Sequence, residues 1–351
     1  MFEKKTVFQK ENENVSALMC DWLPWEQFAE KNIFVTGGTG LVGSALIRTL
    51  LSANAEKKLG LQVYALVRDT EKARAMLPND AALILAQGDM AMLPEINAPL
   101  HYIVHTASPT ASKFFVEHPV ETVKTAVCGT MNVLELAREK GAQSFVYLSS
   151  MEVYGENQSD EPLLEDAPVL TNPLSVRSSY PQSKLICENL CVGYAAQYGI
   201  SCKVIRLAQT FGPGIPANDN RVFAQFARAA MEKTNIVLQT PGTTKQTYLH
   251  TADAVTAILA VLLKGQAGQV YNAANPANYC SIREMAELVA ERIAGGEIAV
   301  RVDIATDAAI KYPPAHKWNL SADKLMALGW KPTADLEQMY RALIADMKQK
   351  V

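Results

Sequence analysis

The chain has 351 residues, of which 49% are hydrophobic and 20% charged, and its net charge at pH 7 is −3. These values are typical of a soluble globular protein with one or two domains. The small negative charge argues against nucleic acid or an anionic membrane surface as a partner. No apolar stretch is long enough to span a membrane, and the first residues form no signal peptide. Six scattered cysteines favour a reducing cytoplasm and predict no metal site.

Residues 1–30 are predicted to form an N-terminal leader. Its aromatic part, Trp22–Phe28, is expected to pack on the body of the protein or on a partner subunit. The short apolar run Ile33–Val35 is then typical of a buried parallel strand. Three glycines with Gly-x-x-Gly-x-x-Gly spacing follow it, and residues 44–51 continue with helical spacing.

A glycine-rich turn between a strand and a helix suits a dinucleotide. Glycines let the backbone approach a pyrophosphate, and the helix N-terminus offers N–H donors to it. The alternative is a turn that merely packs the strand on the helix. The turn predicts cofactor contacts at Gly37, Gly40, Leu41, Val42 and Gly43.

The second strand, Leu61–Val67, bears on the choice of cofactor. Proteins that select NAD usually end this strand with Asp or Glu, which binds the ribose hydroxyls. Here Val67 is followed by Arg68, which could accept the extra phosphate of NADP, stack on adenine or face water. The choice between NAD and NADP therefore stays open.

Two further strands, Ala82–Ala86 and Tyr102–Ala107, end in residues that could contact a cofactor. An Asp at such a strand end can receive the adenine amino group, or it can be a simple turn carboxylate. His105 lies in an apolar strand and is predicted to be a hydrogen-bonded core residue rather than a catalyst. The cofactor contacts expected here are Asp89, Met90, Thr106, Ala107 and Ser108.

Strands and helices alternate through residue 207, with a helix at 119–140 and strands at 144–148 and 201–207. This order predicts an α/β fold with a Rossmann-type, doubly wound parallel sheet. Thr247–Val255 and Val270–Ala274 are expected to return to that sheet. The predicted NAD(P)-binding domain is 31–207 with about 245–275, and the smaller C-terminal substrate-binding domain is 208–244 with 276–351.

Ser150, Tyr180 and Lys184 form a candidate catalytic set. Tyr180 and Lys184 are four residues apart, so a helix places them on one face. A phenol has an ordinary pKa of about 10, and a nearby ammonium favours the phenolate that can act as a base. The Tyr-x-x-x-Lys pair alone is common and could be a surface pair. The pair follows the glycine turn and a serine at a strand end, Ser150, in the chain. This order favours hydride transfer.

These motifs resemble those of the extended short-chain dehydrogenase/reductases, the NAD-dependent epimerase/dehydratase family that acts on nucleotide sugars. The resemblance covers the chain from Lys31 onward and is greatest to the decarboxylases acting on UDP-glucuronate. The segments that carry it are Ser108-Pro109, His118–Thr125, Gly129–Asn132, Ser149–Gly155, Asn172–Lys184, Thr210–Pro213, Asn218–Phe223 and Leu328–Pro332.

The resemblance implies a mechanism in which the sugar C4 hydroxyl is transiently oxidised. A ketone at C4 acidifies the C5 proton and turns a C5 carboxylate into a β-keto acid, which loses carbon dioxide. The resemblance also makes Glu152 a second acid/base group, and an extended segment would place it on the same side as Ser150. The alternative for Glu152 is a structural carboxylate. The substrate contacts it implies are Ser108, Gln209, Arg221, Val222, Lys245 and Gln246.

Several positions depart from the family pattern. Met151 stands where dehydratases have an acid, and an apolar thioether cannot protonate a leaving hydroxyl. Gln246 and Gly214 stand where relatives have arginines on the diphosphate. Lys245 or Arg221 could compensate, or the nucleotide or sugar could differ. The first-choice function is therefore decarboxylation of a UDP-glucuronate-like substrate, with 4-epimerisation and then 4,6-dehydration as alternatives.

A non-catalytic NAD(P)-binding protein is the alternative from another class. It is disfavoured because such a protein need not keep the whole catalytic set. The resemblance also implies a homodimer that uses the helix of Tyr180 and Lys184. The apolar residues of that helix could serve the dimer or the core, and they are Leu185, Ile186, Leu190 and Tyr194.

Overall fold

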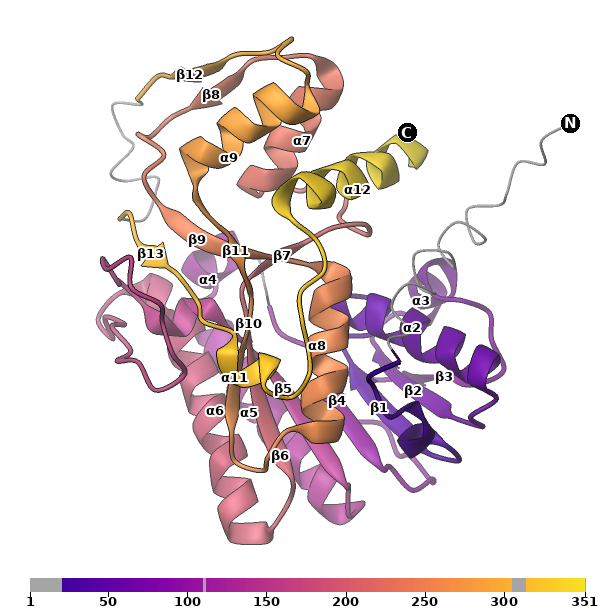
Figure 1. The fold of residues 1–351 in the computed structure, drawn as a ribbon. Helices are drawn as coiled ribbons and strands as arrows, with labels where there is room; N and C mark the ends of the chain where they lie inside the picture. The colour runs from indigo at the N-terminus through magenta and orange to yellow at the C-terminus, as the bar shows by residue number, and fades with distance from the viewer. Residues whose placement is uncertain (1–20, 110–111, 305–313, 351) are drawn as a thin grey trace, which may run out of the picture.

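The computed structural model describes residues 21–109, 112–304 and 314–350. Its main layer is a seven-stranded parallel sheet in the order β3-β2-β1-β4-β5-β6-β10 (Figure 1). The strand order reverses between β1 and β4, which is where ligands bind in such sheets. The strands are β1 (Asn32–Thr36), β2 (Gln62–Val67), β3 (Leu83–Gln87), β4 (Tyr102–His105), β5 (Ser144–Ser150), β6 (Cys202–Leu207) and β10 (Val270–Ala273). The predicted α/β fold is confirmed.

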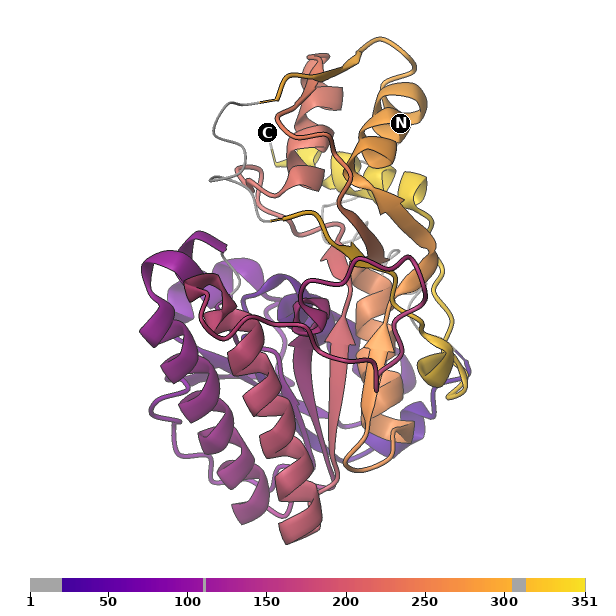
Figure 2. The same ribbon diagram turned by 90° about the vertical axis from the view of Figure 1, so that its left-hand side faces the viewer.

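Helices cover both faces of this sheet, because alternate strand residues point to opposite faces. Ile33 and Val35 pack in the cluster beneath one set of helices, and Phe34 packs in the other cluster. Figure 2 shows α5 and α6 side by side on their face. The first set is α2 (Leu41–Lys57), α3 (Thr70–Met76) and α8 (Thr251–Lys264), and the second is α5 (Pro119–Glu139) and α6 (Ser179–Tyr198).

A smaller layer lies beyond the carboxyl ends of the main strands (Figures 1 and 2). Its core includes Phe211, which stacks on Phe223 with ring centres 4.6 Å apart. One sheet contains β7 (Gln209–Phe211), β9 (Lys245–His250), β11 (Asn275–Ser281) and β13 (Lys317–Trp318), and β8 (Ile236–Leu238) pairs with β12 (Val300–Val302). The helices are α7 (Val222–Glu232), α9 (Ile282–Leu288) with the π-helical turn Val289–Ile293, and α12 (Leu336–Gln349).

The expected return of Thr247–Val255 to the main sheet is wrong. Residues 247–250 belong to β9, which pairs with β7, β11 and β13, and Thr251 begins α8. The backbone of β9 is satisfied in the second sheet, and His250 ends the strand by accepting a hydrogen bond from Ala252 N at 3.3 Å. The expected return of Val270–Ala274 is confirmed by β10. The proposed domain boundaries remain a prediction.

The aromatic segment before β1 packs on the body of the protein. Trp25 and Phe28 are buried in the core, on the short helix Trp25–Phe28. Lys264 Nζ, at the end of α8, donates to the Trp22 carbonyl at 2.9 Å and lies 4.9 Å from the centre of its indole ring. The rest of the predicted leader, residues 1–20, lies outside the described residues.

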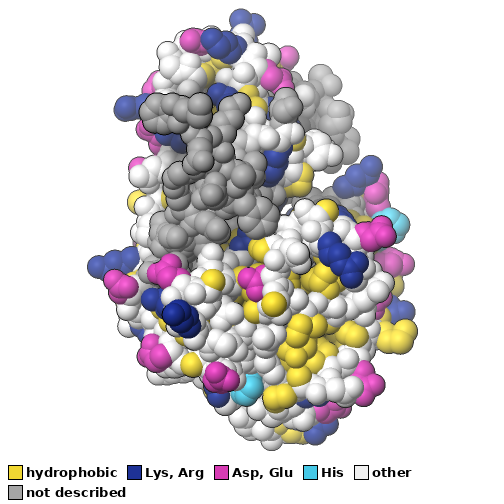
Figure 3. Space-filling model, turned by 90° about the vertical axis from the view of Figure 1, so that its right-hand side faces the viewer, with side chains coloured by type: hydrophobic (Ala, Val, Ile, Leu, Met, Phe, Trp, Pro, Cys, Tyr) yellow, Lys and Arg dark blue, Asp and Glu magenta, His cyan; other side chains and the backbone are white. Residues whose placement is uncertain are grey.

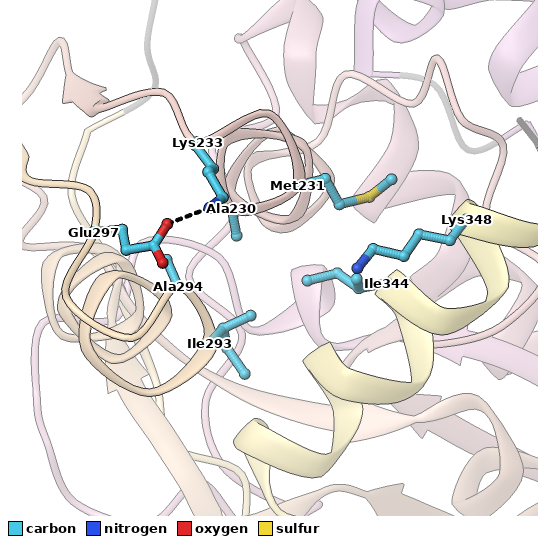
Figure 4. Close-up of a pocket in the computed structure, with 8 residues that line it drawn as sticks. All are labelled: Ala230, Met231, Lys233, Ile293, Ala294, Glu297, Ile344 and Lys348. Carbon is cyan, nitrogen blue, oxygen red and sulfur yellow. Dashed lines mark ion pairs between the residues drawn. The ribbon is translucent and has the colours of Figure 1, made fainter.

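Two surface features lie apart from the expected site residues. Hydrophobic side chains gather on the lower part of the face in Figure 3, the side on which the edge strand β3 lies. A pocket in the smaller layer opens between α7, the π-helical turn and α12, beside the 2.6 Å ion pair of Lys233 with Glu297 (Figure 4). Its lining consists of Ala230, Met231, Lys233, Ile293, Ala294, Glu297, Ile344 and Lys348. None of these is an expected site residue.

A buried lysine on β6 provides a test of the core. Lys203 is 3% exposed, and Nζ donates to Ser144 Oγ at 2.7 Å, while no carboxylate pairs with it among the described residues. Burial lowers the pKa of Lys203 to about 8. The unfolded chain therefore binds the proton more tightly than the folded chain does, so charged Lys203 destabilises the fold most below this pKa.

Replacing Lys203 by Met is therefore expected to raise the free energy of unfolding by about 1–3 kcal/mol near neutral pH. Ser144 Oγ stays paired, because it donates to the Leu262 carbonyl at 2.6 Å. The gain should shrink as the pH rises above the folded-state pKa of Lys203, since the wild-type amine is then neutral. Urea unfolding at neutral and alkaline pH measures the gain in the free energy of unfolding. An equal gain at both pH values would contradict the account.

Candidate active site

The glycine turn between β1 and α2 fits tightly against the end of β4. Gly37 has φ +69°, and a Cβ there would lie 2.7 Å from Thr106 Oγ1. A Cβ on Gly43 would lie 2.3 Å from the Gly37 carbonyl oxygen. Gly40 precedes α2, whose first residues are Leu41 and Val42. The unpaired N–H groups of this helix start are those that suit a pyrophosphate.

Replacing Gly43 by Ala is expected to lower the free energy of unfolding by about 1–3 kcal/mol and to weaken dinucleotide binding more than about tenfold, because the turn must open. Thermal unfolding and a binding titration measure the two effects. Gly193 on α6 is the control, because a Cβ there meets nothing within 4 Å. If Gly43→Ala matches Gly193→Ala in both measurements, this turn is not a close-packed cradle.

The ends of β1 and β4 are joined by a buried polar network. His105 Nδ1 lies 2.7 Å from Thr36 Oγ1, and its Nε2 lies 3.1 Å from Thr130 Oγ1. Burial lowers the pKa of His105 to about 3, so the ring is neutral. The prediction of a hydrogen-bonded core histidine is confirmed. Ala107 N donates to Thr36 Oγ1 at 3.1 Å, which fixes the backbone at the expected cofactor edge.

Ser108, just beyond β4, carries a buried hydroxyl that has no hydrogen-bond partner among the described residues. A buried hydroxyl of this kind is free to bond to a bound ligand or to a water. Thr106 Oγ1, in contrast, donates to the Thr36 carbonyl at 2.6 Å and therefore has a structural partner.

The expected adenine side of the cofactor site follows β2 and β3. Arg68 is exposed directly after the buried Val67, and Asp69 caps α3 by accepting from Lys72 N at 2.9 Å. Asp89 Oδ1 accepts from the backbone N–H groups of Ala91 and Met92 at 2.8 and 2.9 Å, so it acts as a turn carboxylate. Met90 is buried.

The end of β5 places Ser150 and Glu152. The expectation of an extended segment here is wrong, because the chain enters a 3₁₀ turn over Met151–Tyr154. Ser150 Oγ accepts from Glu152 N at 3.2 Å, and this cap starts the turn. Glu152 nevertheless lies near the phenol of Tyr180, whose pKa it raises. Met151 is 4% exposed and packs in the core.

Helix α6 places Tyr180 and Lys184 against β5. The Tyr180 phenol lies near the Ser150 hydroxyl, and its ring stacks on Phe115 of α4 (Ser112–Glu117) at 4.2 Å. Lys184 Nζ donates to the Leu148 carbonyl at 2.7 Å and lies 5.7 Å from the centre of the Tyr180 ring. Burial lowers the pKa of Lys184 to about 8, and burial with the Glu152 carboxylate raises the pKa of Tyr180. Burial therefore opposes the phenolate that Lys184 was expected to favour.

Arg177 is a site residue that the sequence analysis did not identify. It lies on the short helix Val176–Ser178, and Nη2 is 2.7 Å from Glu152 Oε2. Its guanidinium lies 4.9 Å from the centre of the Phe115 ring, and its charge lowers the pKa of Tyr180. Its position three residues before Tyr180 was the one feature of the sequence that could have indicated it as a site residue. The phenol thus lies beside one carboxylate and one guanidinium.

The expected substrate contacts in the smaller layer have partners within the chain. Gln246 is buried, and Nε2 donates to the Tyr248 hydroxyl at 3.1 Å. Lys245 Nζ lies 3.3 Å from Asp160 Oδ1. Gln209 is on β7, and Val222 begins α7.

Arg221 Nη2 lies 2.7 Å from Asp219 Oδ2. Both cations that could replace the missing diphosphate arginines are therefore paired with acids. Gly214 comes near the cofactor turn, because a Cβ there would lie 3.2 Å from Leu41 Cδ1.

Comparison with known proteins places these features in a family. The model of the NAD dependent epimerase/dehydratase family matches residues 33–274, which contain the glycine turn and the whole catalytic set. The chain belongs to the NAD dependent epimerase/dehydratase family. It is accordingly an enzyme of this family, with a nicotinamide dinucleotide as its cofactor.

Similar relatives include UDP-glucuronic acid decarboxylases. The chain is 29% identical over 306 residues to UDP-glucuronic acid decarboxylase 6 of Arabidopsis thaliana, covering 87% of this chain and 85% of that one. It is 29% identical to UDP-glucuronic acid decarboxylase 1 of Xenopus tropicalis, covering 88% and 70%. The family is thus represented by relatives similar over most of the chain.

Solved structures show the same fold. UDP-glucose 4-epimerase of Thermus thermophilus in complex with NAD is 25% identical, has a TM-score of 0.75, and is matched over 91% of this chain and 100% of that one. UDP-glucuronic acid 4-epimerase of Bacillus cereus is 21% identical with a TM-score of 0.74 and the same coverage. Among the helices that the structure describes, none is both long and apolar enough to cross a membrane.

Proposed function

We propose that this enzyme decarboxylates a UDP-glucuronate-like nucleotide sugar through transient oxidation at C4. The observation that carries the proposal is the Arg177–Glu152 pair beside Tyr180. A guanidinium binds a carboxylate through paired hydrogen bonds, so Arg177 offers a counter-charge for the C5 carboxylate of a uronic acid. A neutral hexose has no carboxylate that could pair with Arg177.

Tyr180 and Ser150 act on the C4 hydroxyl. The Tyr180 phenolate takes the hydroxyl proton, while Ser150 hydrogen-bonds with the same oxygen and orients it. Lys184 stabilises the charge on the phenolate from one turn away. The lysine ammonium is fixed for this role by the Leu148 carbonyl.

Glu152 acts at C5. When the sugar carboxylate pairs with Arg177, the Glu152 carboxylate is released from its ion pair and can take up a proton. In its acid form, Glu152 can then deliver that proton to C5 after carbon dioxide leaves. A 4-epimerase that acts on UDP-glucuronate would also use Arg177, but its chemistry requires no proton exchange at C5. Glu152 is therefore the residue that favours decarboxylation over epimerisation, the second candidate.

We propose NAD as the cofactor. The chain fits a dinucleotide, because the glycine turn forms a cradle that a Cβ would fill and Ser108 presents an unpaired buried hydroxyl. The bound nicotinamide would accept a hydride from the sugar and return it. The residues that would hold it are Gly37, Gly40, Leu41, Val42, Gly43, Arg68, Asp89, Met90, Thr106, Ala107, Ser108, Tyr180 and Lys184.

The nucleotide would lie on the side of the smaller layer, against Gln209, Arg221, Val222, Lys245 and Gln246, with Ser108 on the sugar. Arg221 and Lys245 would leave Asp219 and Asp160 to bind the diphosphate. The five free cysteines of the described residues suit a reducing cytoplasm.

We further propose a homodimer through α5 and α6. Ile186 is 46% exposed, whereas Leu185, Leu190 and Tyr194 pack against the core clusters. Exposed hydrophobic side chains on these two helices support such an interface, and they are Val120, Met131, Ile186, Val192 and Tyr198. Analytical sedimentation of the full chain tests the dimer.

Mass spectrometry of the enzyme with NAD and separate UDP-sugars tests the function. UDP-glucuronate is expected to lose carbon dioxide. A new epimer of unchanged mass, identified by NMR, would instead select the 4-epimerase.

Replacing Arg177 by Leu is expected to weaken UDP-glucuronate binding about ten- to a hundredfold and to leave UDP-xylose binding unchanged, because UDP-xylose lacks the carboxylate. Calorimetric titration measures both affinities. Arg341, in an exposed ion pair with Glu337, is the control position for an Arg-to-Leu change. An equal loss for both sugars would show that Arg177 does not recognise the carboxylate.

A further inference from the structure

A third residue of α6 contacts the end of β5 on the same face as Tyr180 and Lys184. Glu188 follows Lys184 by four residues, so the helix aligns the three side chains. Ser149 Oγ donates to Glu188 Oε1 at 2.5 Å, next to the bond from Lys184 Nζ to the Leu148 carbonyl. Consecutive residues of β5 are therefore fixed by consecutive turns of α6.

The Glu188 carboxylate is itself held from the neighbouring strand. Arg206 of β6 donates from Nε to Oε1 at 3.0 Å and from Nη2 to Oε2 at 2.7 Å, in a fork. Its remaining Nη1 donates to the Glu165 carbonyl at 2.8 Å, and both residues of the pair are 5% exposed. This bidentate pair fixes the position of a negative charge inside the protein.

Burial lowers the pKa of Lys184, and Cys187, Glu188 and Cys191 raise it; Glu188 is the carboxylate among these three. Lys184 is 3% exposed, and no described carboxylate lies within ion-pair distance of its ammonium. His105 is neutral because burial lowers its pKa, and burial raises the pKa of the Tyr147 phenol and of the Cys191 thiol. Cys187 donates its thiol proton to the Ala126 carbonyl. The groups near Lys184 are His105 of β4, Tyr147 of β5, Tyr180, Cys187, Glu188 and Cys191 of α6, and, beyond Glu188, Arg206 of β6.

We propose that Glu188 is a positioning residue for the reaction: its carboxylate, fixed by Arg206, keeps the Lys184 ammonium charged and holds the end of β5 against α6. Glu188 touches neither substrate nor cofactor in this account and acts through Lys184 and Ser149. The proposal deepens the proposed function and rests on it for the role of Lys184, but the charge on Lys184 can be measured without any substrate.

The charge is tested by NMR titration of lysine side chains in the full-length protein. The double variant Glu188→Met/Arg206→Met removes the buried pair together, so no partner is left as a lone buried charge. The pKa of Lys184 is expected to fall by about one unit or more, that is, about tenfold in proton affinity. Lys203, which is also buried, is the internal control and should titrate as in the wild type.

A Lys184 pKa within about 0.2 of the wild-type value would overturn the proposal, because the pair would then be purely structural. The double variant Glu188→Gln/Arg206→Met keeps the volume at position 188 and an acceptor for Ser149, and it also leaves no lone buried charge. It gives the same test should the first double variant fail to fold. The alkaline limb of the pH–rate profile for sugar oxidation should also move to lower pH in these variants. Ser149→Ala retains the carboxylate, so it should leave that limb in place. If no sugar reacts, the proposed function fails while the NMR result still stands.

Discussion

Replacing Tyr180 by Phe is expected to lower kcat/KM for the nucleotide sugar by about a thousandfold, because the variant loses the base that accepts the C4 hydroxyl proton. The phenyl ring keeps the 4.2 Å stack on Phe115, so the fold should persist. Initial rates of product formation measure the effect, and circular dichroism checks the fold.

Tyr198, an exposed residue at the end of the same helix, is the matched control. Tyr198→Phe should retain wild-type activity. If Tyr180→Phe is as active as Tyr198→Phe, every mechanism that begins with oxidation by this phenol fails.

Replacing Glu152 by Gln is expected to lower formation of the decarboxylated product by about a hundred- to ten-thousandfold, because an amide cannot deliver the proton to C5. Oxidation at C4 should continue, since Tyr180 remains, so reduced nicotinamide is expected to accumulate and is visible by its absorbance. The carboxylate also raises the pKa of Tyr180. Its removal should therefore shift the acid limb of the oxidation rate to lower pH.

Glu156, exposed four residues later, is the control for an acid-to-amide change near this turn. Glu156→Gln should behave as the wild type. Unimpaired decarboxylation by Glu152→Gln would assign the proton exchange to another group and leave Glu152 as the partner of Arg177.

The main sheet could be predicted because its buried parallel strands are continuous apolar runs, as at Ile33–Val35. The second sheet could not be predicted, because the residue pattern of β9 is the same whichever sheet the strand joins. Its partners come from residues far apart in the sequence, and β13 alone is about seventy residues away. The length of β5 was also underestimated, because Ser149 and Ser150 are polar but still pair with β6.

The catalytic set could be predicted from the sequence, because Tyr180 and Lys184 have helical spacing and Ser150 stands at the end of a strand. Arg177 and Glu188 were not predicted, because their roles depend on partners brought from other elements, Glu152 and Arg206. The raised pKa of Tyr180 could not be predicted from the sequence either, because the depth of its burial follows from packing. Spacing thus predicts which groups share a face, and packing decides their charge.

The most direct test is mass spectrometry of the product formed from UDP-glucuronate that carries deuterium at C4. If C4 is oxidised transiently and the hydride returns, the product is lighter by carbon dioxide and retains the deuterium. Loss of carbon dioxide together with the deuterium would contradict the return of the hydride. An unchanged substrate would contradict the proposed substrate class.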